Sequence, residues 1–568
     1  MTRFLLITTA AAALTLGACG KSDTPDSPDT SASTPAAQSS AANAMSSPSI
    51  TSADISRRIE RLSSDDLLGR PPSGPGAQET MDYIASEMKN AGLKPMGKNG
   101  TYFQPVTLTE MTVKPDSFAY IKTPDAVIDF KSGENAVYWT KQFTPSVSVT
   151  DSPLVFVGYG VVAPEYNWND YAGIDVEGKT VVMLVNDPGF EDKNADQFKG
   201  ETMTYYGRWT YKFEEAARQG AAGVIVIHED APASYPWEVV QGGWTGPQFD
   251  LVRPDKGMSR AEMESWITFD QAKALFASAG MDYLTEKAKA KESGFKPVAM
   301  PGLSLSAKIN QDITTTESAN IAGGVTGTKY PDEYILYMAH WDHMGRDESL
   351  DGDQIFNGAV DNATGTAAVI EIGEAFAKAD TPPERSILVV AVTAEESGLL
   401  GSAYYAEDPV VPLKQTVAGI NIDAILPIGE TNDIIVVGYG ASQIEDRLKT
   451  LLDADGKYIV PDQNPSAGYF YRSDHISLAK KGVPMLYADS GVDHVTKGKE
   501  FGMEFGEIYT KERYHKVADE YSSDWDMGGI TYTTQLFYEL GQNISATEEW
   551  PNWYDGNEFR ALRDEMLK

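Results

Sequence analysis

The sequence predicts an α/β fold: a mixed, mainly parallel β-sheet flanked by helices, joined to a separate β-rich segment. From about residue 321, apolar runs typical of buried strands alternate with amphipathic helical stretches. Between about residues 150 and 305, short β-like runs punctuated by Gly, Asp and Pro predominate. A chain of 568 residues is too long for one hydrophobic core, so we expect two or three domains.

The net charge of the chain limits the kinds of molecule that it is expected to bind. It carries 47 basic and 82 acidic residues, a net charge of −35. Nucleic acids and anionic membrane surfaces repel such a chain, so we expect neither as a partner.

The first 19 residues are typical of an export signal. Arg3 precedes an apolar stretch, residues 4–16, that is too short for a convincing membrane span. The stretch ends in Leu-Gly-Ala-Cys19, which resembles the lipobox of bacterial lipoproteins, and Cys19 is the single cysteine. The resemblance implies a signal peptide over residues 1–19 and a lipid on Cys19. We therefore expect an exported protein, anchored to the cell envelope and most simply to the outer membrane, facing the periplasm or the surface; a plain secretory signal is the alternative.

Residues 20–49 are nearly all Ser, Pro, Ala, Thr and Asp, which predicts a disordered linker. Ordered sequence is expected from Ile50. Two stretches with apolar residues at helical spacing, 52–70 and 76–95, predict two helices, the second ending at Gly92. They open the N-terminal part of the main domain, residues 50–148.

The β-rich segment is expected to span residues 149–308. Its strand-like runs are PLVFVGYGVV, KTVVMLVND and AAGVIVIHED, with one helix over 211–219. His228 ends the last of these runs beside two acids, and we interpret it as part of a solvated loop.

The remaining part of the main domain, residues 309–568, alternates strand and helix. Strands are expected at 333–339, 385–394, 417–424, 433–440 and near 480–489, and helices at 363–379, 398–407 and 443–453. Such alternation favours a parallel sheet with helices on both faces, and ligands of such sheets collect at the carboxyl ends of the strands.

Acidic and imidazole side chains stand at these strand ends. His340 and Asp342 follow one strand, the pair Glu395–Glu396 follows the next, and Asp423 ends a third, while Asp361 opens a helix. A single histidine after a strand is more often a hydrogen-bonded loop residue than a ligand. Several carboxylates on one edge need a cation to sit together, and Zn²⁺ accepts both imidazole nitrogen and carboxylate oxygen. Asp342 is suited to orient the His340 ring from outside the metal shell.

Five stretches in order, AHWDHMG, NGAVDNATG, TAEESGLLGS, NIDA and RYHKVADEY, resemble the M28 family of zinc exopeptidases. The resemblance implies a phosphorylase/hydrolase-like α/β fold over residues 50–148 and 309–568. Residues 149–308 resemble an inserted protease-associated (PA) domain.

The resemblance also implies roles for individual residues, with two Zn²⁺ ions as cofactors. His340 and Asp423 would hold one zinc, Glu396 and His515 the other, and Asp361 would bridge them. Glu395 would be the general base that activates the attacking water. Tyr514 matches a position that in some relatives donates its hydroxyl to the oxyanion, and a packing tyrosine is the equal alternative.

Other polar residues are weaker candidates. Asp474 and His475 lie in a stretch similar to one near the family's substrate pocket, and Asp474 could instead cap the following helix. We interpret His343 and His494 as structural or solvated residues, and the acids of residues 347–353 as part of a solvent-exposed loop. The helical H-E-x-x-H motif is absent from the sequence.

The predicted function is that of a di-zinc exopeptidase that removes N-terminal residues from peptides. A non-catalytic binding module on the same fold is one alternative. A carboxypeptidase, a dipeptidase or an amide-cyclising enzyme is another, because the shape of the substrate pocket decides the reaction. The substrate preference and the oligomeric state stay open.

Overall fold

The computed structural model describes residues 50–191, 193 and 197–568. The predicted signal peptide, Cys19 and the linker lie outside the described residues. Across the described part of the chain, no helix combines the length and the apolar character needed to cross a membrane.

The first sheet is mixed, with a parallel centre, which confirms the predicted fold class. Strand β14 pairs in parallel with β17 and β18, and β21 extends this parallel run. Antiparallel strands complete both sides, with β13 and β2 beyond β17, and β19 beside β21. The strands are β1 (Lys94–Pro95), β2 (Phe103–Val113), β11 (Gln248–Leu251), β13 (Val298–Val325), β14 (Tyr330–His340), β17 (Arg385–Val392), β18 (Thr416–Asn421), β19 (Asp433–Val436), β20 (Tyr458–Pro461) and β21 (Met485–Ser490).

This sheet is buried on both faces, because successive residues of its central strands enter different cores. Ile335 and Tyr337 of β14 join a core with α8, whereas Leu336 and Met338 join a core on the opposite face. The first core is covered by α1 (Ser52–Leu62), α2 (Ala77–Asn90), α8 (Gly365–Lys378), α10 (Ile444–Ala454) and α13 (Gly528–Ser545). The second is covered by α9 (Leu400–Glu407), α11 (His475–Ala479) and the chain around α14 (Arg560–Met566).

The two predicted N-terminal helices form as α1 and α2. Thr51 caps α1 by accepting the backbone N–H of Asp54 at 3.1 Å, and α2 ends two residues before Gly92. Arg58 of α1 is buried and pairs with Glu371 and Glu374 of α8. These two ion pairs connect the N-terminal segment to α8, the helix that follows Asp361.

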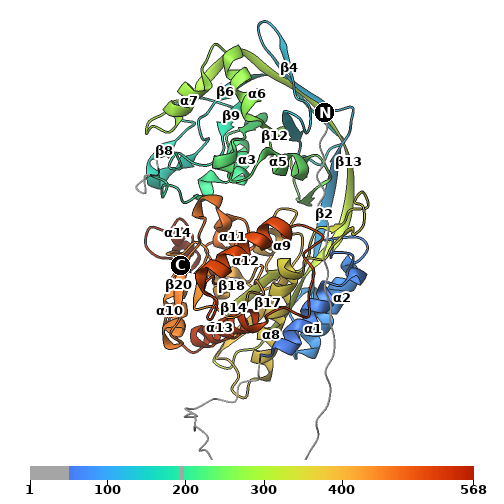
Figure 1. The fold of residues 1–568 in the computed structure, drawn as a ribbon. Coiled ribbons are helices and arrows are strands. Elements are labelled where there is room, and N and C mark those ends of the chain that lie inside the picture. Colours follow the sequence, from blue (N-terminus) through green and yellow to red (C-terminus); the bar gives the residue numbers. More distant parts are fainter. Residues whose placement is uncertain (1–49, 192, 194–196) are drawn as a thin grey trace, which may run out of the picture. The chain divides into compact units, whose positions relative to one another are not determined.

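A second sheet accounts for the β-rich segment. The 28-residue strand β13 belongs to both sheets: its first half pairs with β3 and β6, and its second half with β2 and β17 (Figure 1). The other strands are β3 (Phe118–Lys122), β4 (Val127–Asp129), β5 (Ala136–Trp139), β6 (Ser146–Phe156), β9 (Thr180–Leu184), β10 (Gly223–Ile227) and β12 (Met263–Ile267). Its helices are α3 (Trp209–Arg218), α4 (Asp230–Ala233), α5 (Trp237–Trp244), α6 (Phe269–Ser278) and α7 (Tyr283–Ala290). Because β3, β4 and β5 lie before residue 149, the second sheet begins earlier in the chain than the predicted insert. The domain boundaries and the likeness to a PA domain stay predictions.

Candidate metal centre

The parallel register aligns the carboxyl ends of the three central strands. His340, the last residue of β14, pairs with Val392, the last residue of β17. β18 ends two residues earlier along β14, where Asn421 pairs with Met338. Beyond these ends the chain turns through left-handed backbone at Ala394 (φ 52°) and Ala424 (φ 64°). Residues other than glycine rarely adopt this conformation, and it clusters at functional sites. These turns bring the side chains that follow β17 and β18 to the edge where His340 lies.

The predicted ligands form two groups around one aspartate. In the first, Nε2 of His340 lies 3.1 Å from Oδ1 of Asp423 and 3.2 Å from Oδ1 of Asp361. In the second, Nε2 of His515 lies 3.2 Å from Oε2 of Glu396 and 3.3 Å from Oδ2 of Asp361. The two oxygens of Asp361 therefore face different imidazole–carboxylate pairs.

These distances fit a metal ion better than hydrogen bonds alone. An imidazole nitrogen carries at most one hydrogen, in the plane of the ring, yet each of these Nε2 atoms faces two carboxylate oxygens. Ligand atoms about 2.0–2.1 Å from a tetrahedral Zn²⁺ lie about 3.3 Å from one another. Both groups have nitrogen and oxygen donors at this spacing, so the donor set fits zinc, and Asp361 is common to both groups.

His343, which we interpreted as structural or solvated, also reaches the site. It is fully buried, and its Nδ1 lies 2.6 Å from Oε1 of Glu396, the oxygen that His515 does not contact. His343, Asp361 and Glu396 also qualify as a three-ligand group by the distances between their donor atoms. The backbone N–H of His343 donates to Arg70 O, and the side chain points inward to Glu396.

The site concentrates negative charge in a buried space. Burial raises the pKa of Glu395 well above its usual value, and the charges of Glu396 and Asp423 raise it further. Burial opposes protonation of His340, but Asp423 and Glu395 raise its pKa well above the ordinary histidine value. Buried carboxylates in excess of cationic partners favour the binding of a cation.

Asp342 supports the site differently from the prediction. Nδ1 of His340 lies 3.1 Å from the backbone carbonyl oxygen of Asp342, and 3.9 Å from its carboxylate. The carboxylate instead accepts the backbone N–H groups of Glu395, at 3.0 Å, and Glu396, at 3.4 Å. The ring is thus oriented by the backbone, and the side chain orients the two glutamates.

Three further residues that the sequence did not single out hold the site. Ser473 donates to Oδ2 of Asp423 at 2.5 Å. The carboxylate of Asp519 accepts the backbone N–H of Asp361 at 3.1 Å. Arg70 is buried, and its guanidinium donates to the carbonyl oxygens of residues 62, 341, 357 and 358. Arg70 belongs to the stretch LLGR, and this motif is the signal that could have revealed it.

The weaker candidates have mixed outcomes. The Tyr514 ring stacks on His515, with centroids 3.9 Å apart, and is 41% exposed. Asp474 and His475 are fully buried, and the Asp474 side chain makes no capping bond to α11, so the capping alternative is wrong. The role of both residues in a substrate pocket stays a prediction.

The two remaining histidines are buried and hydrogen-bonded, and the remaining acids are exposed. His494 is buried and accepts the backbone N–H groups of Thr496 and Lys497, as predicted for a structural residue. His228 is also buried, with Nε2 3.1 Å from Tyr235 O, so its prediction as a solvated residue is wrong. The acids of residues 347–353 are exposed, as expected for a solvent-exposed loop.

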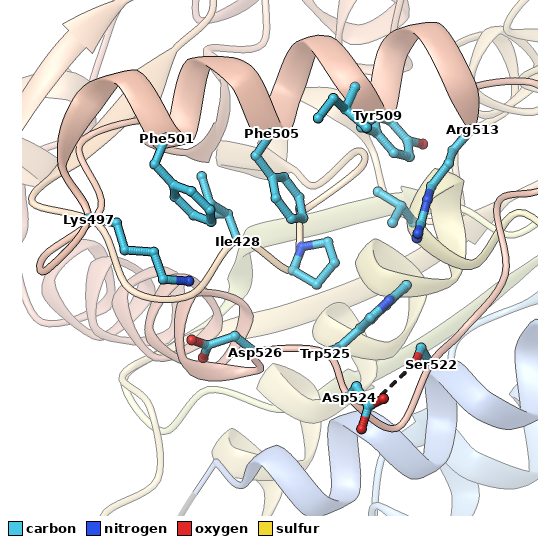
Figure 2. A pocket seen from close by; sticks show the side chains of 13 residues that line it. Ile428, Lys497, Phe501, Phe505, Tyr509, Arg513, Ser522, Asp524, Trp525 and Asp526 are labelled. Carbon is cyan, nitrogen blue, oxygen red and sulfur yellow. Dashed lines mark hydrogen bonds between the residues drawn. The ribbon is translucent and has the colours of Figure 1, made fainter. Parts of the chain in front are cut away.

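A pocket of about 350 Å³ lies beside the centre, beneath α12 (Gly498–Glu512). Figure 2 shows Phe501 and Phe505 projecting from α12 toward Trp525, with Lys497 at one end and Arg513 at the other. Its wall includes Val360, the neighbour of Asp361, but none of the predicted site residues. The pocket is therefore adjacent to the ligand cluster without containing it.

Comparison with known proteins supports the motif-based prediction. Residues 320–538 match the family model described as "Peptidase family M28". Mouse "Aminopeptidase NAALADL1" is 32% identical over 137 residues, 23% of this chain and 17% of that protein. The "Glutamate carboxypeptidase 2 homolog" of Caenorhabditis elegans is 31% identical over 134 residues, 23% of this chain and 16% of that protein. The chain thus spans less than a fifth of the length of these relatives.

Among solved structures, the aminopeptidase from Aneurinibacillus sp. strain AM-1 aligns over 87% of this chain and 93% of its own, with 18% identity and a TM-score of 0.48. The similarity to the family depends on the family model and on the five motifs, all of which lie within its range. Residues 320–538 of this chain are thus similar to peptidase family M28, whose model they match.

Proposed function

We propose that this protein is a zinc-dependent exopeptidase that removes N-terminal residues from peptides. One observation carries the proposal: the two oxygens of Asp361 face separate imidazole–carboxylate pairs, one with His340 and one with His515. The match of residues 320–538 to the M28 family model and relatives with peptidase names support it.

The proposed cofactor is a pair of zinc ions. His340 and Asp423 would hold one ion, His515 and Glu396 the other, and Asp361 both. When bound, zinc supplies Lewis acidity for the scissile carbonyl and makes water a better nucleophile near neutral pH.

The protein's own residues carry the proton and position the reactants. Glu395 would accept a proton from the attacking water and deliver it to the nitrogen of the leaving group as the C–N bond breaks. Its backbone N–H is held by the Asp342 carboxylate, so the base keeps its place relative to His340. Tyr514, stacked on His515 and partly exposed, could donate its hydroxyl to the oxyanion.

A carboxypeptidase or dipeptidase is the second candidate. A matching relative is named a glutamate carboxypeptidase homolog, which keeps this reaction open. Peptides blocked at either end distinguish the two, because an aminopeptidase requires a free N-terminus and a carboxypeptidase a free C-terminus.

The decisive experiment is the substitution Glu395→Gln. We expect hydrolysis of aminoacyl reporter substrates to fall by about 10²- to 10⁴-fold, while zinc content stays that of the wild type, because the base is lost but the ligands remain. Asp347→Asn, in the exposed loop, is the matched control. Near wild-type turnover in the Gln variant would contradict the assigned base. A wild-type protein that cleaves no reporter or peptide in a chelator-sensitive manner would favour the non-catalytic binding module.

We also propose export and lipid anchoring through Cys19. A Cys19→Ala change would move the protein from the membrane to the soluble envelope fraction and abolish incorporation of labelled fatty acid. Unchanged membrane association without lipid incorporation would contradict the anchor.

A further inference from the structure

The pocket beneath α12 presents charged groups of both signs to one space. Lys497 and Arg513 line it together with Asp524 and Asp526. Within the described part of the chain, none of these four side chains forms an ion pair. Charges that line one pocket without neutralising one another are available to the charges of a ligand.

One end of this pocket combines an ammonium group with a carboxylate. Figure 2 shows Lys497 and Asp526 at the same end, whereas Arg513 lies at the other. The Lys497 ammonium lies 4.1 Å from the centroid of the Phe501 ring, a contact that holds it at the pocket wall. Oδ1 of Asp526 accepts the backbone N–H of Gly528 at 3.1 Å, and its Oδ2 accepts no hydrogen bond from the described residues. This end can therefore bind a negative and a positive charge that stand close together.

The rest of the pocket is mainly apolar. Phe501 and Phe505 face Trp525 across it, and Ile428 belongs to the same wall (Figure 2). The indole Nε1 of Trp525 is shielded from solvent and has no hydrogen-bond partner. Buried polar groups are usually satisfied, so this N–H is available to an acceptor. The volume of about 350 Å³ is that of a site for a small molecule.

Hydrogen bonds connect the pocket wall to the candidate metal centre. Tyr509 lines the pocket, and its hydroxyl donates to Oδ2 of Asp519 at 3.4 Å. Val360 also lines it, and its backbone N–H donates to Oδ1 of Asp519 at 3.1 Å. The same carboxylate accepts the backbone N–H of Asp361 at 3.1 Å. A ligand that contacts Tyr509 or Val360 therefore acts on Asp361 through one carboxylate.

We propose that this pocket binds a free apolar amino acid. Lys497 binds its α-carboxylate, Asp526 binds its α-ammonium group, and its side chain lies between α12 and Trp525. A fatty acid or an apolar amine would pair with only one of the two charges and leave the other without a partner. The inference rests on the proposed function, because an exopeptidase releases such amino acids as products beside the pocket.

The bound amino acid inhibits hydrolysis without occupying the catalytic centre. The donor atoms of the centre already stand at the spacing of zinc ligands, so a displacement of Asp361 would weaken the centre. Such inhibition lowers kcat and leaves KM nearly constant, whereas competition at the catalytic centre raises only KM. The product would thus limit the rate of its own release.

Fluorescence titration of the zinc-loaded protein with L-leucine tests the binding. Because Trp525 lies in the pocket wall, we expect a saturable change in indole emission that Trp525→Phe abolishes. Lys497→Met and Asp526→Asn should each raise Kd about tenfold, because a charged hydrogen bond is lost. Lys499→Met and Glu500→Gln, which remove exposed charges in the first turn of α12 outside the pocket, are the matched controls.

Two analogues separate the charges of the ligand. N-acetylleucine lacks the ammonium group and leucinamide lacks the carboxylate, so each should bind about tenfold more weakly than leucine. Asp526→Asn should not weaken the binding of N-acetylleucine further, and Lys497→Met should not weaken that of leucinamide. A wild-type Kd for leucine in both variants, or analogues that bind as tightly as leucine, would overturn the proposal.

Steady-state hydrolysis of alanine p-nitroanilide gives the inhibitory readout. Leucine should lower the kcat of the wild type. In Lys497→Met and Asp526→Asn this fall should require about tenfold more leucine, while kcat without leucine stays that of the wild type. Binding of leucine with no fall in kcat would overturn the connection to Asp361.

The failure of this proposal and that of the peptidase function are distinguishable. If leucine changes the emission of Trp525 and the two charge variants weaken this binding, but no peptide or reporter is cleaved, the pocket stands and the peptidase function fails. If peptides are cleaved in a zinc-dependent manner and leucine changes neither the emission of Trp525 nor kcat, the peptidase function stands and the pocket proposal fails.

Discussion

Three imidazole groups lie at the candidate metal centre, and two of them contact Glu396. His515 contacts Oε2 of Glu396 and also Asp361, whereas His343 contacts only Oε1 of Glu396. We therefore propose His515 as the ligand and His343 as the residue that orients the carboxylate.

The two histidines can be separated by metal analysis. His515→Gln should lose one zinc equivalent per chain after dialysis at defined free zinc, because a ligand is removed. His343→Gln should keep both ions at saturating zinc but bind one about 10- to 100-fold more weakly, as expected for a residue outside the ligand shell. Elemental analysis across a series of free zinc concentrations measures both. If His343→Gln cannot be saturated and His515→Gln can, the ligand assignment is reversed.

Arg70 is a positioning residue for the loops that carry His340 and Asp361. Its guanidinium binds carbonyl oxygens on both sides of the centre, at Trp341 and Gly358. Lysine cannot reproduce these bonds, so Arg70→Lys should leave buried acceptors unsatisfied, each costing about 1–3 kcal/mol. We expect a lower Tm and a fall in kcat with little change in KM, measured beside the partly exposed control Arg61→Lys. Wild-type kcat together with wild-type Tm would contradict this role.

Tyr514 offers a direct test of oxyanion donation. Removal of its hydroxyl in Tyr514→Phe keeps the ring that stacks on His515. If the hydroxyl stabilises the transition state, kcat should fall about 10²- to 10³-fold with KM nearly constant. An unchanged kcat would indicate a packing tyrosine.

At the scale of elements, strand β11 carries a buried carboxylate, that of Asp250, which pairs with two cationic side chains. Oδ1 of Asp250 lies 2.7 Å from Arg253, and Oδ2 lies 3.4 Å from Lys141. Burial alone would raise the pKa of Asp250, but these cations lower it to about 2, against an ordinary value of 3.8. A depressed pKa in the folded state means that the charged form stabilises the fold above about pH 4, and that this contribution disappears as the pH falls toward 2.

Asp250→Asn should therefore lower the free energy of unfolding by about 2 kcal/mol at pH 7. The difference from the wild type should shrink as the pH falls from 4 toward 2, where the native carboxylate also becomes protonated. Urea unfolding across this range, with the exposed Asp125→Asn as control, measures it. A difference independent of pH would show that the lost charge is not its cause.

The elements that the sequence predicted differ from the observed ones in their bounds rather than in their type. The expected strands and helices of residues 333–489 form as β14, α8, β17, α9, β18, β19, α10 and β21. The 28-residue β13 and the helices α12 and α13 were not predicted. The sequence of β13 has no single alternation of apolar and polar residues, because its two halves belong to different sheets and face different cores. Much of α12 is exposed, so its apolar face is weak in the sequence.

At the scale of the whole molecule, the metal centre joins distant parts of the chain. Its groups come from the ends of β14, β17 and β18, from the turn that precedes α8 and from the chain after α12. Asp361 therefore does not open the helix, as the sequence had suggested, because α8 begins only at Gly365. Without cations, these carboxylates repel one another in a buried space. Bound ions would therefore stabilise the fold as well as support catalysis.

Metal removal should expose this coupling. An ion present at 100 times its Kd adds about 2.7 kcal/mol to stability, provided that it binds only the folded state. We expect a chelator to lower Tm by several degrees and abolish peptide hydrolysis, and added zinc to restore both. Glu395→Gln should show the same Tm shift while staying inactive. An identical Tm with and without chelator would argue against bound metal.

The sequence by itself determined the fold class and the resemblance to the M28 family, together with the side chains that approach one another at the centre. These follow from local patterns: apolar runs mark buried strands, and the polar residues directly after parallel strands must lie at one edge. Only the tertiary structure decided that Asp342 orients the glutamates, that His343 turns inward, and that Arg70, Asp519 and Ser473 hold the centre. Such contacts join segments far apart in the chain, and their geometry depends on how the elements pack rather than on any local periodicity.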